Sequence, residues 1–194
     1  MSWGKFIATA GLFGAYIVKD TIPDEKIEIL RDNCNNLRDR AMIDFLLSTG
    51  IRVGKLVRLN IDDIDFSERE CVVYGKGDKE RKAYFDAKTK IHLLNYIESR
   101  TDNNIALFVS LNKPHSRLTE SGVELRLRER GKKLGVEKVH PHKFRRTMAT
   151  RAIEKGMPIE QVQKILGHEQ IDTTLRYAMV NQNNVKLSHR KYIS

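Results

Sequence analysis

The sequence predicts a mainly helical domain with a small antiparallel sheet. Apolar residues recur at helical spacing in several separate segments, and two short β-prone segments are joined by a turn that contains glycine. With 194 residues and 40% hydrophobic content, the chain can bury one core but is short for two full domains. We therefore expect one principal domain of α+β class.

The first two helices are predicted on either side of Arg52. Apolar residues recur at helical spacing over residues 36–48, and Gly50 follows as a stop signal. A second, shorter apolar set covers residues 53–59 and leads into a turn rich in aspartate. Arg52 is therefore expected at the junction of two helices.

A β-hairpin is predicted after this turn. Residues 71–74 and 81–85 read as two strands, and the connection over 75–80 contains two glycines. This arrangement places Lys76 at the tip of the hairpin.

Two further helices are predicted in the middle of the chain. They cover residues 90–99 and 121–134, and the second is strongly basic. Ser121 and Glu124 have the spacing of a capping box, in which each side chain bonds a free backbone amide at the helix start. We therefore expect the basic helix to open at Ser121.

A helix that begins at Pro141 and ends near Gly156 is predicted to carry two candidate site residues. Proline suits the first turn of a helix, and glycine is common just past its end. His142 and Arg145 are three residues apart, a spacing that puts both on one helix face. Both can thus point at the same ligand.

The last predicted helix covers residues 159–166. Pro158 opens it and Gly167 closes it, so that His168 falls in the following turn. Tyr177 lies in the segment after this turn.

The charge of the chain favours a polyanionic partner. Lysine and arginine number 35 against 25 acidic residues, which gives a net charge of +10. Such a field attracts polyanions and speeds their capture, so nucleic acid is the obvious candidate. The alternative is a soluble basic protein without such a partner.

The cysteines and the N-terminal segment favour a cytoplasmic protein without a membrane anchor. Cys34 and Cys71 lack the spacing of metal ligands, and two isolated thiols do not make a secreted disulfide scaffold. The uncharged stretch 6–18 is too short to span a membrane and lacks a clear signal-peptidase site. We expect it to pack on the domain or to be the remnant of a longer element.

The candidate site residues could together bind and cut a phosphodiester. Attack on a phosphodiester builds negative charge on its oxygens, which planar guanidinium groups neutralise with paired hydrogen bonds, and a tyrosine can supply the nucleophile. Taken singly, each residue has a structural explanation, such as a surface arginine, a turn lysine or a packed tyrosine. The candidate residues are Arg52, Lys76, His142, Arg145, His168 and Tyr177.

These residues occur in ordered motifs that resemble the tyrosine recombinase (phage integrase) family. The resemblance covers residues 23–194 and is specific because all the blocks occur in order with suitable gaps. The blocks are Thr49-Gly50-Ile51-Arg52-Val53-Gly54, Gly75-Lys76-Gly77-Asp78-Lys79-Glu80-Arg81, Pro141-His142-Lys143-Phe144-Arg145, Leu166-Gly167-His168 and Tyr177.

The resemblance implies a tyrosine recombinase catalytic-domain fold that cuts double-stranded DNA through a covalent 3′-phosphotyrosyl intermediate. It implies that no metal or nucleotide cofactor is needed. Tyr177 matches the nucleophile, and Arg52 and Arg145 match the arginines that clamp the scissile phosphate. His168 matches a further hydrogen-bond donor. Lys76 corresponds to the acid that protonates the leaving 5′ oxygen, and His142 to the acid or base that serves the tyrosine hydroxyl.

The chain departs from the family pattern in two places. Lys55 stands where the family usually has an acidic residue, which adds positive charge beside Arg52 and removes a supporting partner. The family also usually carries a helical DNA-binding domain before the catalytic one, and the 22 residues before Pro23 are too few to form it. We expect a stub or linker over 1–22 and the catalytic domain over 23–194.

Three functions are open at this point. The first is recombination or integration of a mobile element, with self-association on DNA. The second is an inactive remnant that binds DNA or interferes with an intact recombinase, and the third is DNA relaxation of the type IB topoisomerase kind. The resemblance implies that the basic tail 178–194 docks on a neighbouring protomer. The alternative is that this tail is a frayed terminus.

Overall fold

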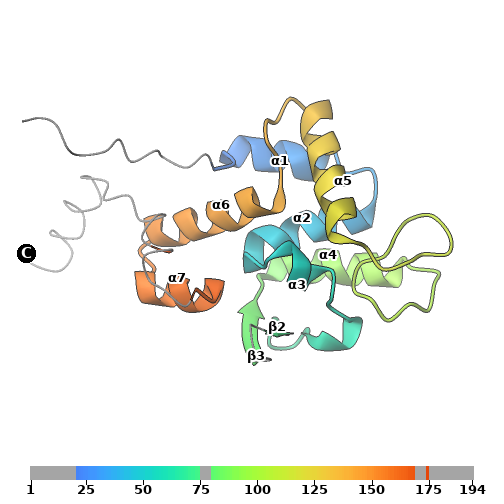
Figure 1. Cartoon of the computed structure of the whole chain (residues 1–194), viewed down its shortest axis with the longest axis horizontal. Helices are drawn as coiled ribbons and strands as arrows, with labels where there is room; N and C mark the ends of the chain where they lie inside the picture. Colours follow the sequence, from blue (N-terminus) through green and yellow to red (C-terminus); the bar gives the residue numbers. More distant parts are fainter. Residues whose placement is uncertain (1–20, 75–79, 169–173, 175–194) are drawn as a thin grey trace, which may run out of the picture.

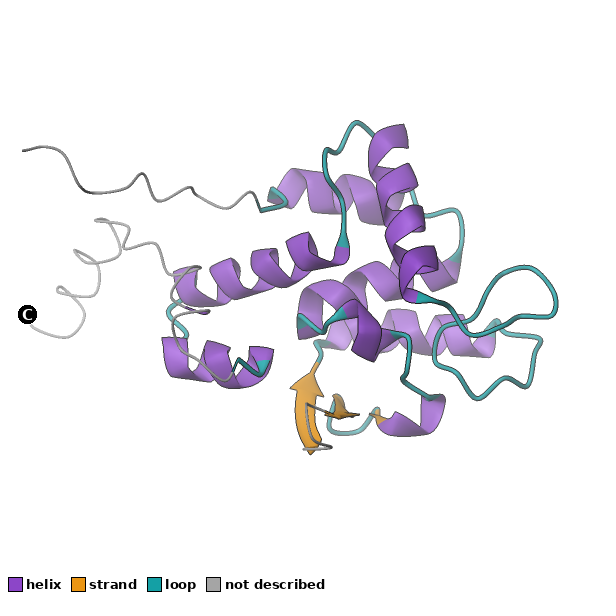
Figure 2. Cartoon of the chain, in the orientation of Figure 1, coloured by secondary structure: helices purple, strands orange, loops and turns teal. Residues whose placement is uncertain are grey.

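Helices predominate over strands in the part of the chain that the structure describes. The computed structural model describes residues 21–74, 80–168 and 174. Figures 1 and 2 show α2 near the centre of the helices and the sheet at one edge. The predicted fold class is confirmed. The helices are α1 (Asp24–Asp32), α2 (Leu37–Thr49), α3 (Val53–Leu56), α4 (Ala87–Glu98), α5 (Glu120–Lys133), α6 (Pro141–Glu154) and α7 (Ile159–Leu166), with a 3-10 turn at Ile61–Asp63.

The central helix α2 is capped at both ends, and the predicted stop at Gly50 is confirmed. Asn36 precedes it and its side chain accepts a hydrogen bond from the backbone amide of Asp39 at 2.8 Å. Gly50 ends it in the left-handed conformation, with φ at 59°. Most of its residues are buried, because the helix packs against α1, α4 and α6. It is therefore the element on which the other helices are assembled.

The sheet consists of β1 (Ile64–Asp65), β2 (Glu70–Tyr74) and β3 (Glu80–Tyr84) in that order. β2 and β3 pair antiparallel, with Cys71 opposite Ala83 and Val73 opposite Arg81. These four residues share the inward face, and their neighbours along each strand point outward. The hairpin strands are confirmed, whereas β1 was not predicted because a two-residue strand carries no periodicity.

Two helix starts differ from the sequence-based expectation. α5 begins at Glu120, and the cap is Thr119, whose hydroxyl accepts a hydrogen bond from the Gly122 amide at 3.1 Å. The proposed capping box at Ser121 is thus wrong by two residues. α4 begins at Ala87 behind an Asp86 cap, earlier than the predicted start at residue 90.

The end of α6 and the whole of α7 follow the prediction closely. α6 ends at Glu154, and Gly156, two residues on, has φ at 90°. α7 runs from Ile159 to Leu166, between Pro158 and the left-handed Gly167. No described helix is long and apolar enough to cross a membrane.

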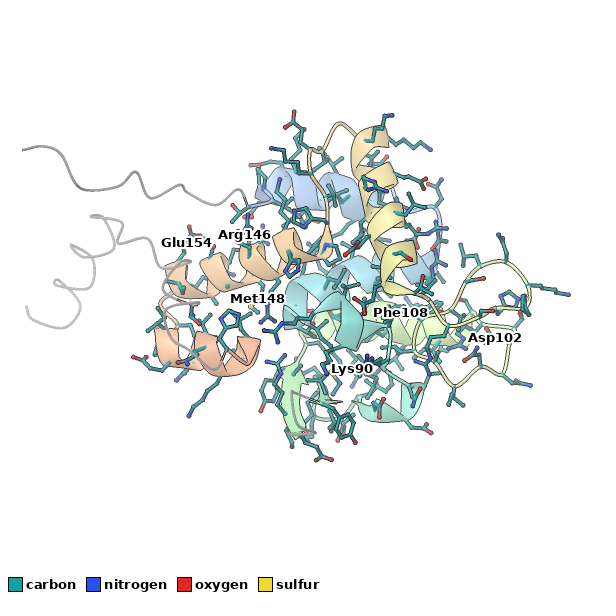
Figure 3. The ribbon with its side chains drawn as sticks, viewed as in Figure 1. Lys90, Asp102, Phe108, Arg146, Met148 and Glu154 are labelled. Atoms are coloured by element: carbon teal, nitrogen blue, oxygen red, sulfur yellow. The ribbon has the colours of Figure 1, made fainter. Side chains whose placement is uncertain are left out.

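Among the described residues, the hydrophobic core lies in two clusters. The larger one surrounds Phe45 of α2, whose ring centroid is 5.9 Å from that of Phe85 and 6.2 Å from that of Phe108. The smaller one lies where α6 faces α7 and includes Val162 and Leu166, with Met148 against it (Figure 3). The second cluster fixes α7 on α6, and through them the turn that carries His168.

Candidate active site

A pocket of about 240 Å³ brings three of the predicted residues together. Its wall includes Arg52, His142 and Arg145, which come from the start of α3 and from α6. Arg52 is the residue before α3, as predicted, and its side chain is exposed. The pocket is lined by Ile51, Arg52, Val53, Gly54, Lys55, Arg58, Glu120, Pro141, His142 and Arg145.

Arg145 is the buried anchor of this pocket. It is 3% exposed, and its guanidinium donates to the carbonyl oxygens of Gly50 and Leu166, each at 2.5 Å. One side chain of α6 thereby ties the end of α2 to the end of α7. Carbonyl acceptors orient a guanidinium without cancelling its charge, so Arg145 keeps its positive charge at the pocket wall.

Gly50 is required at the α2 end of this arrangement. A Cβ atom there would lie 2.2 Å from Cε of Met148, and the φ of 59° is itself unfavourable for other residues. The absence of a side chain lets α6 pack tightly on the end of α2. This close approach brings Arg145 within reach of the Gly50 carbonyl.

His142 lies in the first turn of α6, one turn before Arg145, and its side chain is exposed. Its ring centroid is 6.5 Å from that of His140, which precedes the helix. Burial lowers the pKa of His140, and the neighbouring His142 and Arg146 lower it further. The predicted shared face of His142 and Arg145 is confirmed by their place in one pocket.

His168 approaches the same cations from the end of α7. It follows the left-handed Gly167, and its Nδ1 lies 2.9 Å from the hydroxyl of Thr174. Burial lowers the pKa of His168 to about 4, and the charges of Arg145, Arg52 and Arg81 lower it further. The imidazole is therefore neutral at pH 7 and close enough to these arginines for their charge to lower its pKa.

Arg81 is a neighbour of the site that the sequence-based assignment of roles missed. Burial lowers its pKa, and the charge of Arg52 adds to this effect. It lies within one of the motif blocks, but nothing in the motif assigned it a task. The alternation of burial along β3 is the signal that points its side chain inward with Ala83.

The region around Lys55 contains a carboxylate from another element. Lys55 lines the pocket, as does Glu120, the first residue of α5. A Cβ atom added to Gly54 would lie 2.8 Å from the Glu120 carboxylate. An acidic group therefore stands close to the chain position where the family usually has an acid, although it comes from α5.

Lys76 and Tyr177 lie outside the described residues, so their predicted roles stay predictions. The structure brings together Arg52, His142, Arg145 and His168. Among the described residues, no cluster of histidine, cysteine and acidic side chains could hold a metal ion. Burial raises the pKa of Cys34 to about 11 and that of Cys71 to about 12, which keeps both thiols protonated at neutral pH.

The comparison with known sequences agrees with the family that the motifs indicate. The sequence profile of the phage integrase family matches residues 21–184. The tyrosine recombinase XerC of Staphylococcus aureus is 36% identical in an alignment of 173 residues that covers 84% of this chain and 57% of that protein. XerC of Leptospira interrogans is 38% identical in an alignment of 173 residues that covers 87% of this chain and 56% of that protein. The chain thus spans little more than half the length of these relatives.

Solved structures share the fold. The crystal structure of XerA recombinase superposes with a TM-score of 0.78 and 31% identity, over 90% of this chain and 65% of that one. The Tn1549 transposon integrase with circular intermediate DNA gives 0.76 at 21% identity, over 89% and 66%. XerH bound to its difH substrate gives 0.73 at 22% identity, over 91% and 55%. At these lower identities the likeness is evidence for the fold alone.

Proposed function

The chain belongs to the phage integrase family, and from that premise we propose that it cleaves and rejoins DNA in site-specific recombination. The observation that carries the proposal is the pocket shared by Arg52, His142 and Arg145, with His168 beside it. It gathers cationic and proton-transferring groups around a volume open to a phosphate. The relatives named XerC are tyrosine recombinases, which supports the same reaction class here.

The two arginines bind the scissile phosphate in this proposal. Arg145 is held by carbonyl oxygens on two sides, so its guanidinium is fixed before DNA arrives. Arg52 is exposed at the pocket rim and approaches the phosphate from α3. Preorganised charges of this kind stabilise the negative charge that builds up in the transition state.

His168 acts as a neutral hydrogen-bond donor. This role requires the tautomer in which Nδ1 accepts from the Thr174 hydroxyl, 2.9 Å away, and Nε2 carries the proton. In this role Nε2 donates to a non-bridging phosphate oxygen. A neutral donor suits this position because the neighbouring arginines disfavour another positive charge there.

Tyr177 and Lys76 complete the reaction. The Tyr177 hydroxyl attacks the phosphorus and passes its proton to His142, while the bond from phosphorus to the 5′ oxygen breaks. Lys76 protonates the departing 5′ oxygen, which would otherwise be a poor leaving group. The product is a 3′-phosphotyrosyl bond whose energy permits religation of another 5′ hydroxyl without ATP or a cofactor.

The biological setting we propose is the integration or excision of a mobile element in the cytoplasm, with several protomers assembled on double-stranded DNA. The high positive charge supports DNA as the partner, because phosphate neutralisation supplies much of the affinity of such proteins. Lys55 favours a second candidate, an inactive remnant that binds DNA without cutting it. Relaxation of supercoils is a third candidate, which the topology of the products distinguishes from recombination.

Covalent capture tests the proposal. The protein is incubated with a nicked half-site from the host element, or from a random-sequence pool, that loses its cleaved fragment by diffusion. A denaturing gel then reports protein joined to DNA, with Tyr177→Phe as the control. We expect a covalent band that the substitution abolishes. Binding of DNA without any band would favour the inactive remnant and overturn the cleavage proposal.

A further inference from the structure

Arg81 of β3 reaches across to the last turn of α7. Its Nη1 donates to the carbonyl oxygen of Ile165 and, at 3.5 Å, to that of Lys164. The guanidinium also lies against Gly167, where an added Cβ atom would be 2.7 Å from Nη1 and 3.0 Å from Cζ. A side chain at residue 167 would displace the guanidinium from this position, so the glycine leaves room for the contact.

The end of α7 suits such a contact. The last carbonyl groups of a helix have no partner within it and carry partial negative charge, so a cation that donates to them is stabilising. Arg145 donates to the next carbonyl, that of Leu166, from α6. Two guanidinium groups from different elements thus bind consecutive carbonyls of one helix turn.

This contact has an electrostatic cost that a merely structural tether would avoid. Arg81 is partly buried and lies near Arg52, and both features disfavour its charge. A neutral side chain could fill the same space without repelling the pocket arginines. Residue 81 instead carries a cation that bonds a carbonyl oxygen of the last turn of α7, and this turn leads directly into His168.

From these contacts we infer that Arg81 is a positioning residue that holds the Gly167–His168 turn, and with it the His168 imidazole, against the Arg52 and Arg145 pocket. The inference rests on the DNA cleavage proposed above, for which His168 is a hydrogen-bond donor. Misplacing such a donor by about 1 Å costs up to about 100-fold in rate, so the Arg81 contact that holds its turn contributes to catalysis.

Three variants separate positioning from charge. Arg81→Gln removes both the charge and the guanidinium, and Arg81→Lys keeps the charge but loses the planar fork. Lys82→Gln is the matched control, because Lys82 is the next residue of β3, faces outward and bonds Glu70 at 2.5 Å. All three are compared as the full chain.

The first measurement follows the turn in the protein alone by NMR. In Arg81→Gln we expect the Gly167 and His168 amides to exchange with solvent at least about tenfold faster, because the guanidinium contact that holds the turn is lost. The His168 titration midpoint should rise, because one of the nearby cations is gone. Arg81→Lys should exchange faster but keep its midpoint near that of the wild type. Lys82→Gln should match the wild type in both.

The second measurement is the rate of covalent capture on the nicked half-site. We expect Arg81→Gln to slow capture by about 10-fold to 100-fold, with DNA affinity changed by less than about threefold, and Arg81→Lys to fall between it and the wild type. Unchanged exchange and titration in Arg81→Gln would overturn the inference, as would normal capture by a variant whose turn has opened. If the wild type captures no DNA, the cleavage proposal fails. Unchanged amide exchange in Arg81→Gln would even then refute the positioning role of Arg81.

Discussion

Two groups of arginines in this molecule are held by different acceptors. Around Asp39, Arg38 donates from Nε at 3.0 Å and from Nη2 at 2.6 Å, and Arg126 and Arg130 of α5 approach the other carboxylate oxygen at 3.2 and 3.0 Å. Asp39 and Arg38 are buried. Here the negative charge sits among the cations and offsets part of their charge, so the cluster joins α2 to α5.

At the pocket, by contrast, the acceptors are carbonyl oxygens. Arg145 donates to Gly50 and Leu166, and Arg81 to Ile165. A carbonyl dipole satisfies a guanidinium N–H but leaves its net charge intact. The comparison separates a cluster in which three arginines share one carboxylate from a pocket region in which two arginines donate to backbone carbonyl oxygens.

The largest expected effect concerns the carboxylate of the first group. Burial raises the pKa of Asp39, but the charge of Arg38 and hydrogen bonds from Arg38 and Asn36 outweigh it, so its pKa lies below the ordinary value. Replacing Asp39 with alanine leaves the buried Arg38 without its partner. We expect Asp39→Ala to lower the free energy of unfolding by about 3–5 kcal/mol in urea denaturation.

The matched control for that variant is Asp32→Ala. Asp32 is exposed and bonds Arg40 at 3.4 Å, so its loss should cost no more than about 1 kcal/mol. If both variants lose equally little stability, the Asp39 cluster is not structural and the distinction between the two groups fails.

The next effect concerns Arg52, which lines the same pocket as Arg145. Arg52 is exposed, so Arg52→Gln should leave the unfolding midpoint nearly unchanged. It should nevertheless slow covalent capture by at least about 100-fold, or about 2.7 kcal/mol in activation free energy, because a preorganised charge is lost from the transition state. The capture rate and the thermal unfolding midpoint are measured on the same sample.

Lys88→Gln provides the charge-matched control, because Lys88 is exposed on α4 and outside the pocket. Equal loss of capture in both variants would mean that net charge, rather than the place of Arg52, determines activity. Near-normal capture by Arg52→Gln would remove it from the site.

The fold was predictable where local signals decide the structure. Asn36 and Gly50 mark the ends of α2 because each makes its capping interaction within a few residues. The start of α5 was placed wrongly because Thr119 and Ser121 both carry a suitable hydroxyl. Which of them caps the helix depends on tertiary packing, including the burial of Val123, and that packing is not a local signal.

The site was predictable only in part for the same reason. The shared face of His142 and Arg145 follows from their spacing, but their approach to Arg52 and His168 depends on how α3, α6 and α7 pack. The family resemblance supplied that convergence. Arg81 was missed because its contact with the end of α7 depends on how that helix packs against β3, which sequence spacing alone does not define.

The smallest expected effect is a pH dependence that belongs to the pocket. The pKa of His168 is about 4, below its ordinary value of 6.5. Between these values the unfolded chain binds more protons at this residue than the folded protein does, so its contribution to stability is complete above pH 6.5 and decreases as the pH falls toward 4. In His168→Asn, the decrease in unfolding free energy between pH 6.5 and 4.5 should be shallower than in the wild type, as measured by urea denaturation at each pH. Protonation of Asp39 also lowers the stability, but it occurs below this pH window because the pKa of Asp39 is lowered. That loss of stability is common to the wild type and the variant. Parallel profiles would show that His168 carries no such penalty and that the pocket arginines do not act on it.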